Sequence, residues 1–113
     1  MTLQEREARA CAIIDSMAEE LCDVSLYLHD NPELGLDEHK AVKVINQFLE
    51  THNFTSQVGL TDLPELQTAL RGDYNGSAQH KIAFLGEYDA LPELGHGCGH
   101  NLIAMMSLGA AIA

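Results

Sequence analysis

Residues 86–101 read Gly86-Glu87-Tyr88-Asp89-Ala90-Leu91-Pro92-Glu93-Leu94-Gly95-His96-Gly97-Cys98-Gly99-His100-Asn101, a polar, glycine-rich segment that joins two apolar runs. The first run, Ile82 to Leu85, has the length of a buried strand, and the second, Leu102 to Ala113, has the length of a helix. A loop between the carboxyl end of a strand and the start of a helix is where α/β folds place their chemistry. The segment therefore predicts an α/β fold whose functional loop is residues 86–101.

Three side chains in this 86–101 loop could bind a metal: His96, Cys98 and His100. Thiolate and imidazole are ligands of zinc and related divalent ions. The interleaved glycines permit positive φ, so the loop can fold tightly around an ion. We expect Asn101 to cap the following helix, whose positive end would favour the ligating thiolate. The loop is interpreted as half of a metal site.

Other interpretations of the same residues stay open. A single Cys-x-His is a weak pattern, and it also fits a glycine-rich turn with a buried thiol. Alternatively, Cys98 could be a nucleophile with His96 or His100 as its base, although the sequence shows no orienting group and no oxyanion hole for it. Asp89, at the end of the strand, could accept a hydrogen bond from the outer nitrogen of a metal-bound histidine and fix its tautomer.

Upstream of the loop the sequence predicts two helices. Residues 2–30 carry an apolar stripe at steps of three and four and predict one long helix that Asn31-Pro32 ends. The second helix is expected from an N-cap at Asp37 to about His52, with Asn53 as a left-handed stop. The apolar positions of the first helix are Ala10, Ile13, Ile14, Met17, Leu21, Val24 and Leu28.

The middle of the chain predicts strands. Residues 55–58, 66–71 and 81–86 are the candidates, and Asn75-Gly76 is a hairpin signal that predicts antiparallel pairing of 66–71 with 81–86. Residues 101–113 predict a helix that is apolar nearly all round and needs cover on every side. The chain therefore resembles the front part of a larger domain, cut inside or just after a core helix.

The composition limits the classes of partner and the compartment expected for the chain. A length of 113 residues suits one domain, and a net charge of −11 argues against nucleic acids and anionic membranes. The three cysteines are an odd number, and the polar N-terminus does not resemble a secretion signal, so a reduced, cytoplasmic protein is expected. The Leu102–Ala113 run is too short to span a bilayer.

Two stretches resemble a known family. Residues 87–101 are similar to the signature of the aminoacylase and carboxypeptidase-like dinuclear metallopeptidases, in their amidohydrolase branch. The version here is most similar to peptidase domain-containing dipeptidases and aminobenzoyl-glutamate hydrolases. Residues 29–35, with Glu38 after them, resemble the N-terminal His-x-x-Pro-Glu-Leu-Gly stretch of that family. The resemblance covers essentially the whole chain.

The resemblance implies a site. Cys98 matches a thiolate that ligates and bridges two divalent ions, zinc or manganese, and His100 matches a second ligand. Asp89 matches a supporting acidic residue, whereas His96 matches a position not usually counted as a ligand. The general-base glutamate, two further histidines and a lid domain used for dimerisation would lie beyond Ala113. Residues 1–113 would then be the N-terminal portion of a mixed-sheet catalytic domain.

The function implied for the full-length protein is metal-dependent hydrolysis of N-acyl amino acids or dipeptides by a cytoplasmic homodimer. Because two ligands do not hold a dinuclear centre, residues 1–113 alone are expected to be inactive. Two alternatives belong to other classes. One is a non-catalytic, truncated relative that binds a partner through its uncovered core helix. The other is a cysteine–histidine hydrolase or redox thiol, in which alkylation of Cys98 would not respond to zinc.

Overall fold

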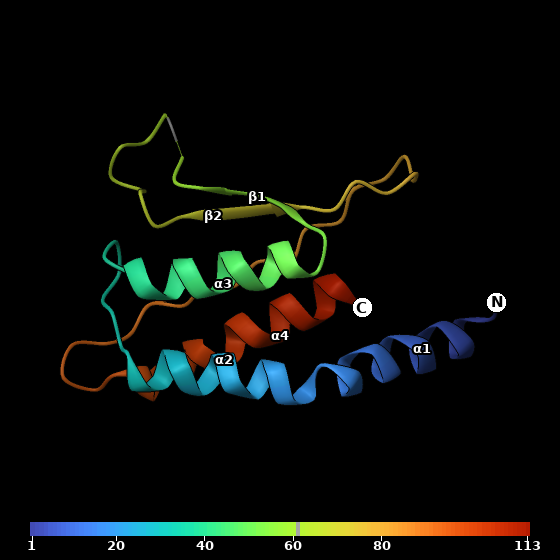
Figure 1. The fold of residues 1–113 in the computed structure, drawn as a ribbon, viewed down its shortest axis with the longest axis horizontal. Coiled ribbons are helices and arrows are strands. Elements are labelled where there is room, and N and C mark those ends of the chain that lie inside the picture. Colours follow the sequence, from blue (N-terminus) through green and yellow to red (C-terminus); the bar gives the residue numbers. More distant parts are fainter. Residues whose placement is uncertain (61) are drawn as a thin grey trace.

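The computed structural model describes residues 1–60 and 62–113. In chain order its elements are α1 (Leu3–Ser16), α2 (Ala18–Asp30), α3 (His39–Thr51), β1 (Thr55–Val58), β2 (Leu70–Asp73), a single 3-10 turn (His96–Cys98) and α4 (His100–Ile112). Figure 1 shows the two-stranded ribbon lying over α3, with α4 and α2 on the other side of α3. The described part of the chain is thus mixed α/β, in agreement with the predicted class.

The predicted helix over residues 2–30 is two helices. They are separated at Met17, whose φ of −103° and ψ of 3° leave the helical range. The Ser16 hydroxyl donates to the Ile13 carbonyl at 2.6 Å, a local bond that competes with the helical ladder. The apolar stripe is buried only from Met17 onward, at Val24 and Leu28, and α1 has no buried residue.

The predicted N-cap of α3 was wrong. Glu33 performs the capping, because its carboxylate accepts from the backbone N–H of Lys40 at 2.9 Å and of Ala41 at 2.8 Å. Asp37 instead contacts the His39 ring at 2.9 Å. The turn after Pro32 brings Glu33 back over the start of the helix. Glu33 is several residues away from the helix in the sequence, so the usual N-cap pattern does not predict its role. The predicted left-handed stop at Asn53 is confirmed, with φ of 66°.

The strands are partly as predicted. β1 has the expected bounds, but it is β1 that pairs with β2, antiparallel, from Thr55 opposite Asp73 to Val58 opposite Leu70. The strand predicted over residues 66–71 begins only at Leu70, because the backbone between Leu66 and Ala69 forms the hydrogen bonds of turns. Residues 81–86 form no strand, so their predicted pairing with 66–71 was wrong. They run beside α4, where the Ser107 hydroxyl donates to the Leu85 carbonyl at 2.5 Å.

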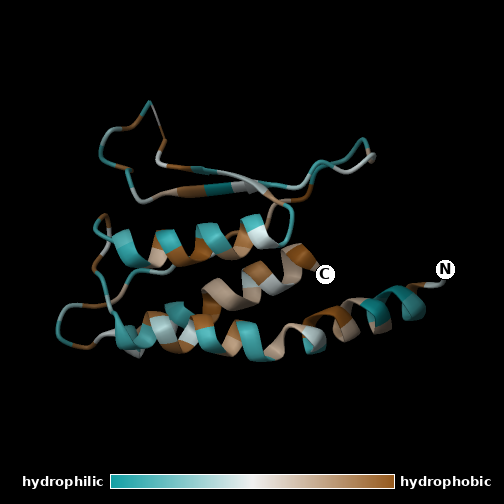
Figure 2. Cartoon of the chain, viewed as in Figure 1, coloured by the Kyte–Doolittle hydropathy of each residue, from teal (hydrophilic) through white to brown (hydrophobic). Residues whose placement is uncertain are grey.

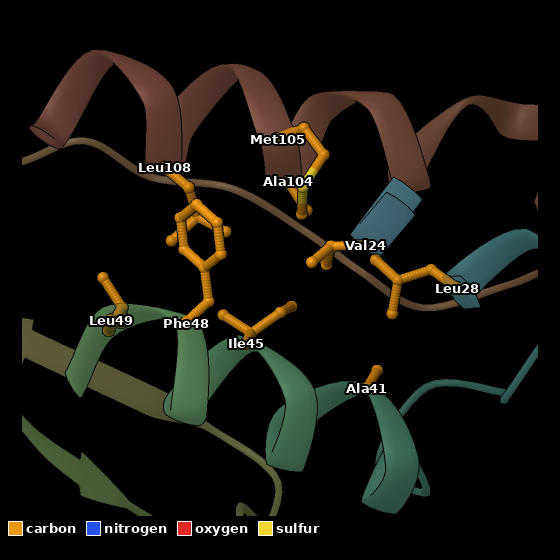
Figure 3. Close-up of a cluster of buried hydrophobic side chains, with 9 residues drawn as sticks. All are labelled: Val24, Leu28, Ala41, Ile45, Phe48, Leu49, Ala104, Met105 and Leu108. Carbon is orange, nitrogen blue, oxygen red and sulfur yellow. The ribbon is translucent and has the colours of Figure 1, made fainter. Parts of the chain in front are cut away.

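The core lies where α2, α3 and α4 meet. Figure 2 shows hydrophobic residues gathered between these helices, and Figure 3 shows the side chains interleaved there. The cluster consists of Val24, Leu28, Ala41, Ile45, Phe48, Leu49, Ala104, Met105 and Leu108. α4 therefore occupies the centre of the fold, as its apolar sequence predicts.

One side of α4 is nevertheless open. Leu102 is 59% exposed and Met106 is 72% exposed, so the described residues do not supply all of the cover that this apolar helix was expected to need. Within that part of the chain, no helix is both long enough and apolar enough to span a membrane.

Candidate metal centre

The 86–101 loop is closed by backbone contacts at its base and shaped by glycines. Leu91 and Gly95 exchange two backbone hydrogen bonds, Leu91 N–H to Gly95 O at 2.9 Å and Gly95 N–H to Leu91 O at 3.1 Å. The 3-10 turn His96–Cys98 follows, and Gly99 enters α4 with φ of 81°. No heavy atom lies within 4 Å of a Cβ built on Gly99, so glycine is needed there for its backbone conformation and not for space.

The ring of His100 is held by Asp89. Its Nδ1 lies 2.8 Å from Asp89 Oδ1 and 3.1 Å from the Asp89 carbonyl oxygen. Both side chains are about two-thirds to three-quarters buried, with 24% of His100 and 33% of Asp89 exposed. A proton on Nδ1 that is donated to Asp89 leaves Nε2 with a free lone pair, which is the form of histidine that binds a metal. The structure brings these two predicted residues together, and their roles toward a metal stay predictions.

Cys98 contacts the same carbonyl. Its half-buried Sγ is 3.9 Å from the Asp89 carbonyl oxygen, so Cys98 and His100 both flank one backbone atom. A thiol and an imidazole with free Nε2 fit a zinc-type ion chemically. Within residues 1–60 and 62–113, however, no group of three or more His, Cys, Asp or Glu is placed to hold an ion. The donor set fits part of a metal site and not a complete one.

The pairing of Cys98 with a histidine base is not seen. Among the hydrogen bonds of the described residues, the Cys98 thiol contacts only the Asp89 carbonyl, and Nδ1 of His100 is occupied by Asp89. The nucleophile interpretation requires direct contact between thiol and ring.

His96 is buried beside this pair. It is 8% exposed, and its Nδ1 has no hydrogen-bond partner among the residues that the structure describes. Burial is the main cause that holds the pKa of His96 below its ordinary value, and the nearby rings of His29 and His100 act in the same direction. His96 is therefore a packed side chain whose neutral form is favoured by burial. The geometry does not bring it together with Cys98 and His100 as a third ligand.

Asn101 does not cap α4, so that prediction was wrong. It is buried, and its Nδ2 donates to Ser25 Oγ at 3.2 Å and to the Ser25 carbonyl at 3.4 Å. Gly99 takes the N-cap position, where no side chain caps the helix. Asn101 thus ties the start of α4 to α2, and it fixes the helix that carries His100.

Sequence reasoning missed a second polar group next to the loop. The Tyr88 hydroxyl donates to the Thr68 carbonyl, and the Thr68 hydroxyl donates to the Glu38 carboxylate. Burial, together with the negative charge of Glu38, raises the pKa of Tyr88 to about 12. The position of Tyr88 directly before Asp89 was the only available signal, because nothing in the sequence links residues 38, 68 and 88.

The comparisons with known proteins agree with the loop sequence. The chain is 37% identical over 116 residues to the Xaa-Arg dipeptidase of Mus musculus, covering 97% of this chain and 27% of the relative. It is 35% identical over 119 residues to the Xaa-Arg dipeptidase of Homo sapiens, with the same coverage. It is 30% identical over 117 residues to a p-aminobenzoyl-glutamate hydrolase chain of Escherichia coli K12, covering 88% of this chain and 24% of the relative.

No protein-family model matches the chain. The chain spans only about a quarter of the length of these curated relatives, with 27% and 24% of their residues covered. The similarity nevertheless runs over almost the whole of this chain and agrees with the resemblance of residues 87–101. On that ground, the chain belongs to the amidohydrolase family that includes the Xaa-Arg dipeptidases and p-aminobenzoyl-glutamate hydrolase.

Proposed function

We propose that this chain supplies part of the metal centre of a metal-dependent amide hydrolase. The observation that carries the proposal is the contact between His100 Nδ1 and Asp89 Oδ1 at 2.8 Å, which leaves Nε2 available as a ligand when Nδ1 carries the proton. Cys98, beside the same Asp89 carbonyl, is the second proposed donor. The relatives are named Xaa-Arg dipeptidase and p-aminobenzoyl-glutamate hydrolase, which supports hydrolysis as the reaction class.

Each residue has a defined task in this proposal. Cys98 Sγ and His100 Nε2 hold the ion, and Asp89 keeps the His100 proton on Nδ1 and orients the ring. A bound zinc or manganese ion would polarise the amide carbonyl and lower the pKa of a bound water. Two donors do not complete a two-metal site, so we assign the remaining ligands and the general-base glutamate to sequence outside residues 1–113. The lid domain and the homodimer are proposed for the whole protein because the resemblance of residues 87–101 implies them.

The proposed substrates are dipeptides and N-acyl amino acids. Dipeptides with arginine as the second residue are the first to test, because two relatives are named Xaa-Arg dipeptidase. The net charge of −11 supports this choice, since a negative surface potential attracts a cationic substrate. A protein of the relatives' length that carries this chain should hydrolyse such a dipeptide, whereas residues 1–113 alone should not.

Cobalt(II) titration of a protein of the relatives' length that carries this chain tests the proposed ligands directly. Bound through a thiolate, cobalt should give a sulfur-to-metal charge-transfer absorption that zinc displaces and a chelator removes. The Cys98→Ser variant should lose this absorption. Cys11→Ser is the matched control, because Cys11 is an exposed cysteine on α1 and should not affect the spectrum. An unchanged spectrum in Cys98→Ser, or no binding by the wild type, would refute the assignment.

A further inference from the structure

A buried chain of three side chains begins next to Asp89 and ends at the start of α3. Tyr88 donates to the Thr68 carbonyl, and Thr68 donates to the carboxylate of Glu38. Thr68 is 3% exposed and Glu38 is 9% exposed. A carboxylate withdrawn from water is costly unless it is hydrogen-bonded, so this contact must form for the local packing to persist.

Both sequence neighbours of Asp89 are held by hydrogen bonds. On one side, Tyr88 is anchored through Thr68 to Glu38. On the other side, the Ala90 N–H donates to the Glu33 carbonyl at 2.7 Å. Gly35, in the turn between these two glutamates, faces the carboxylate, since a Cβ built on it would lie 3.9 Å from Asp89 Oδ2.

The two anchors share one rigid support. Glu33 caps α3 through the N–H groups of Lys40 and Ala41, and the Glu38 carbonyl accepts from Val42 N–H at 3.0 Å. α3 in turn places Ala41 and Ile45 in the core. The position of Asp89 is thereby tied to a helix that contributes to the core and not to the loop alone.

We infer that Glu38, Thr68 and Tyr88 are positioning residues that hold Asp89, and through it the His100 ring, in the orientation that binds a metal. The inference rests on the proposed metal site. None of the three touches the candidate donors Cys98 or His100. Their effect passes through the Asp89 carboxylate, and the loss of such an outer partner typically lowers metal affinity by about 10- to 100-fold.

A matched pair of substitutions at Thr68 tests the inference. Thr68→Val removes the hydroxyl and keeps the shape, whereas Thr68→Ser keeps the hydroxyl. Cobalt affinity should fall about tenfold in Thr68→Val and return to nearly the wild-type value in Thr68→Ser. The wavelength of the charge-transfer band should not move, because Cys98 remains the ligand. Tyr88→Phe, which removes only the other hydroxyl of the chain, should weaken binding in the same way and replaces Thr68→Val if that variant does not fold.

A control variant and a metal-free measurement distinguish a specific effect on the metal site from a general loss of stability. Ile45→Val, a mild core substitution in α3, should lower stability and leave cobalt affinity unchanged. In the metal-free protein, the ¹⁵N resonances of the His100 ring should report a proton on Nδ1 in the wild type and in Thr68→Ser. In Thr68→Val and Tyr88→Phe they should shift toward a mixture of tautomers.

The outcomes distinguish the two proposals. Wild-type protein that binds no cobalt refutes the metal site, and the ring resonances then still decide whether the buried chain positions Asp89. Unchanged resonances and unchanged affinity in both Thr68→Val and Tyr88→Phe overturn the positioning role while leaving the metal site intact. A Thr68→Ser variant as weak as Thr68→Val would also overturn it.

Discussion

At the scale of single residues, the contact between Asp89 and His100 determines what the site can bind. Asp89→Asn keeps the shape of the side chain but replaces the anionic acceptor by an amide, which can also donate to Nδ1 and so favour the wrong tautomer. We expect metal affinity to fall by about 10- to 100-fold, measured by competition with a chromophoric chelator. Glu87→Gln, which removes an exposed carboxylate two residues away, should change it little. Equal affinities for the two variants would contradict the orienting role of Asp89.

Asn101 carries a structural prediction at the same scale. Asn101→Ala leaves the buried hydroxyl of Ser25 without its amide partner and opens space between α2 and α4. We expect the free energy of unfolding to fall by about 1–3 kcal/mol, measured by urea denaturation. Gln47→Ala, an exposed substitution on α3, should change it by less than about 0.5 kcal/mol. A value for Asn101→Ala as small as that of the control would show that the contact with Ser25 adds nothing to stability.

The sequence was informative about which residues gather in the loop, and less so about what each one contacts. Asp89, Cys98 and His100 could be found because their types and spacing lie within one short segment. The actual partner of Asn101 could not be found, because Ser25 is far away in the chain and only the packing of α4 on α2 brings the two together. For the same reason, the link from Tyr88 to Glu38 has no local signature.

At the scale of elements, local patterns predicted the helices and failed on the strand pairing. α3 follows from an apolar period of three to four residues, and α4 follows from an apolar run of helical length. Both are properties of the segment itself. Strand pairing depends on which segment reaches β2, and here that segment is β1. The break between α1 and α2 was missed because the apolar stripe continues across it, although α1 packs little of that stripe.

The start of α1 carries a pH prediction. Thr2 and Glu5 form a capping box, with Thr2 N–H donating to the Glu5 carboxylate at 2.6 Å and Glu5 N–H donating to Thr2 Oγ at 3.2 Å. The hydrogen bond from the Thr2 backbone holds the pKa of Glu5 below its ordinary value. A lowered folded-state pKa means that this stabilisation is present above the unfolded-state pKa and is lost as pH falls through the folded-state pKa.

We therefore expect the first turn of α1 to fray under acidic conditions while α3 remains intact. Amide hydrogen exchange at Glu5 and Arg6, compared with amides in the middle of α3, measures this difference. Glu5→Gln can still accept the hydrogen bond but does not titrate, so its first turn should show no such acid-dependent loss. Fraying of the same extent in Glu5→Gln would assign the effect to another group.

At the scale of the whole molecule, α4 contributes to the core on one face and exposes large apolar side chains on another. Leu102 and Met106 lie four residues apart on one face of α4 and are 59% and 72% exposed. The double variant Leu102→Gln, Met106→Gln should reduce self-association in sedimentation experiments and weaken the fluorescence of a bound hydrophobic dye. Leu3→Gln, at the far N-terminal end of α1, is 73% exposed in the wild type and should have little effect. Equal reductions in the double variant and in Leu3→Gln would show that this face of α4 contributes no more to self-association than other exposed apolar residues.

Metal binding should also stabilise the molecule as a unit. Cys98 and His100 lie at the junction between the 86–101 loop and α4, and α4 contributes Ala104, Met105 and Leu108 to the core. An ion that binds the folded chain and not the unfolded one raises the free energy of unfolding by about 2.7 kcal/mol at a free concentration of about 100 times Kd. Urea denaturation with and without zinc should show this increase in the wild type and in Cys11→Ser. Cys98→Ser should not show it, and a chelator should reverse it. Stabilisation that persists in Cys98→Ser would place the ion elsewhere in the chain.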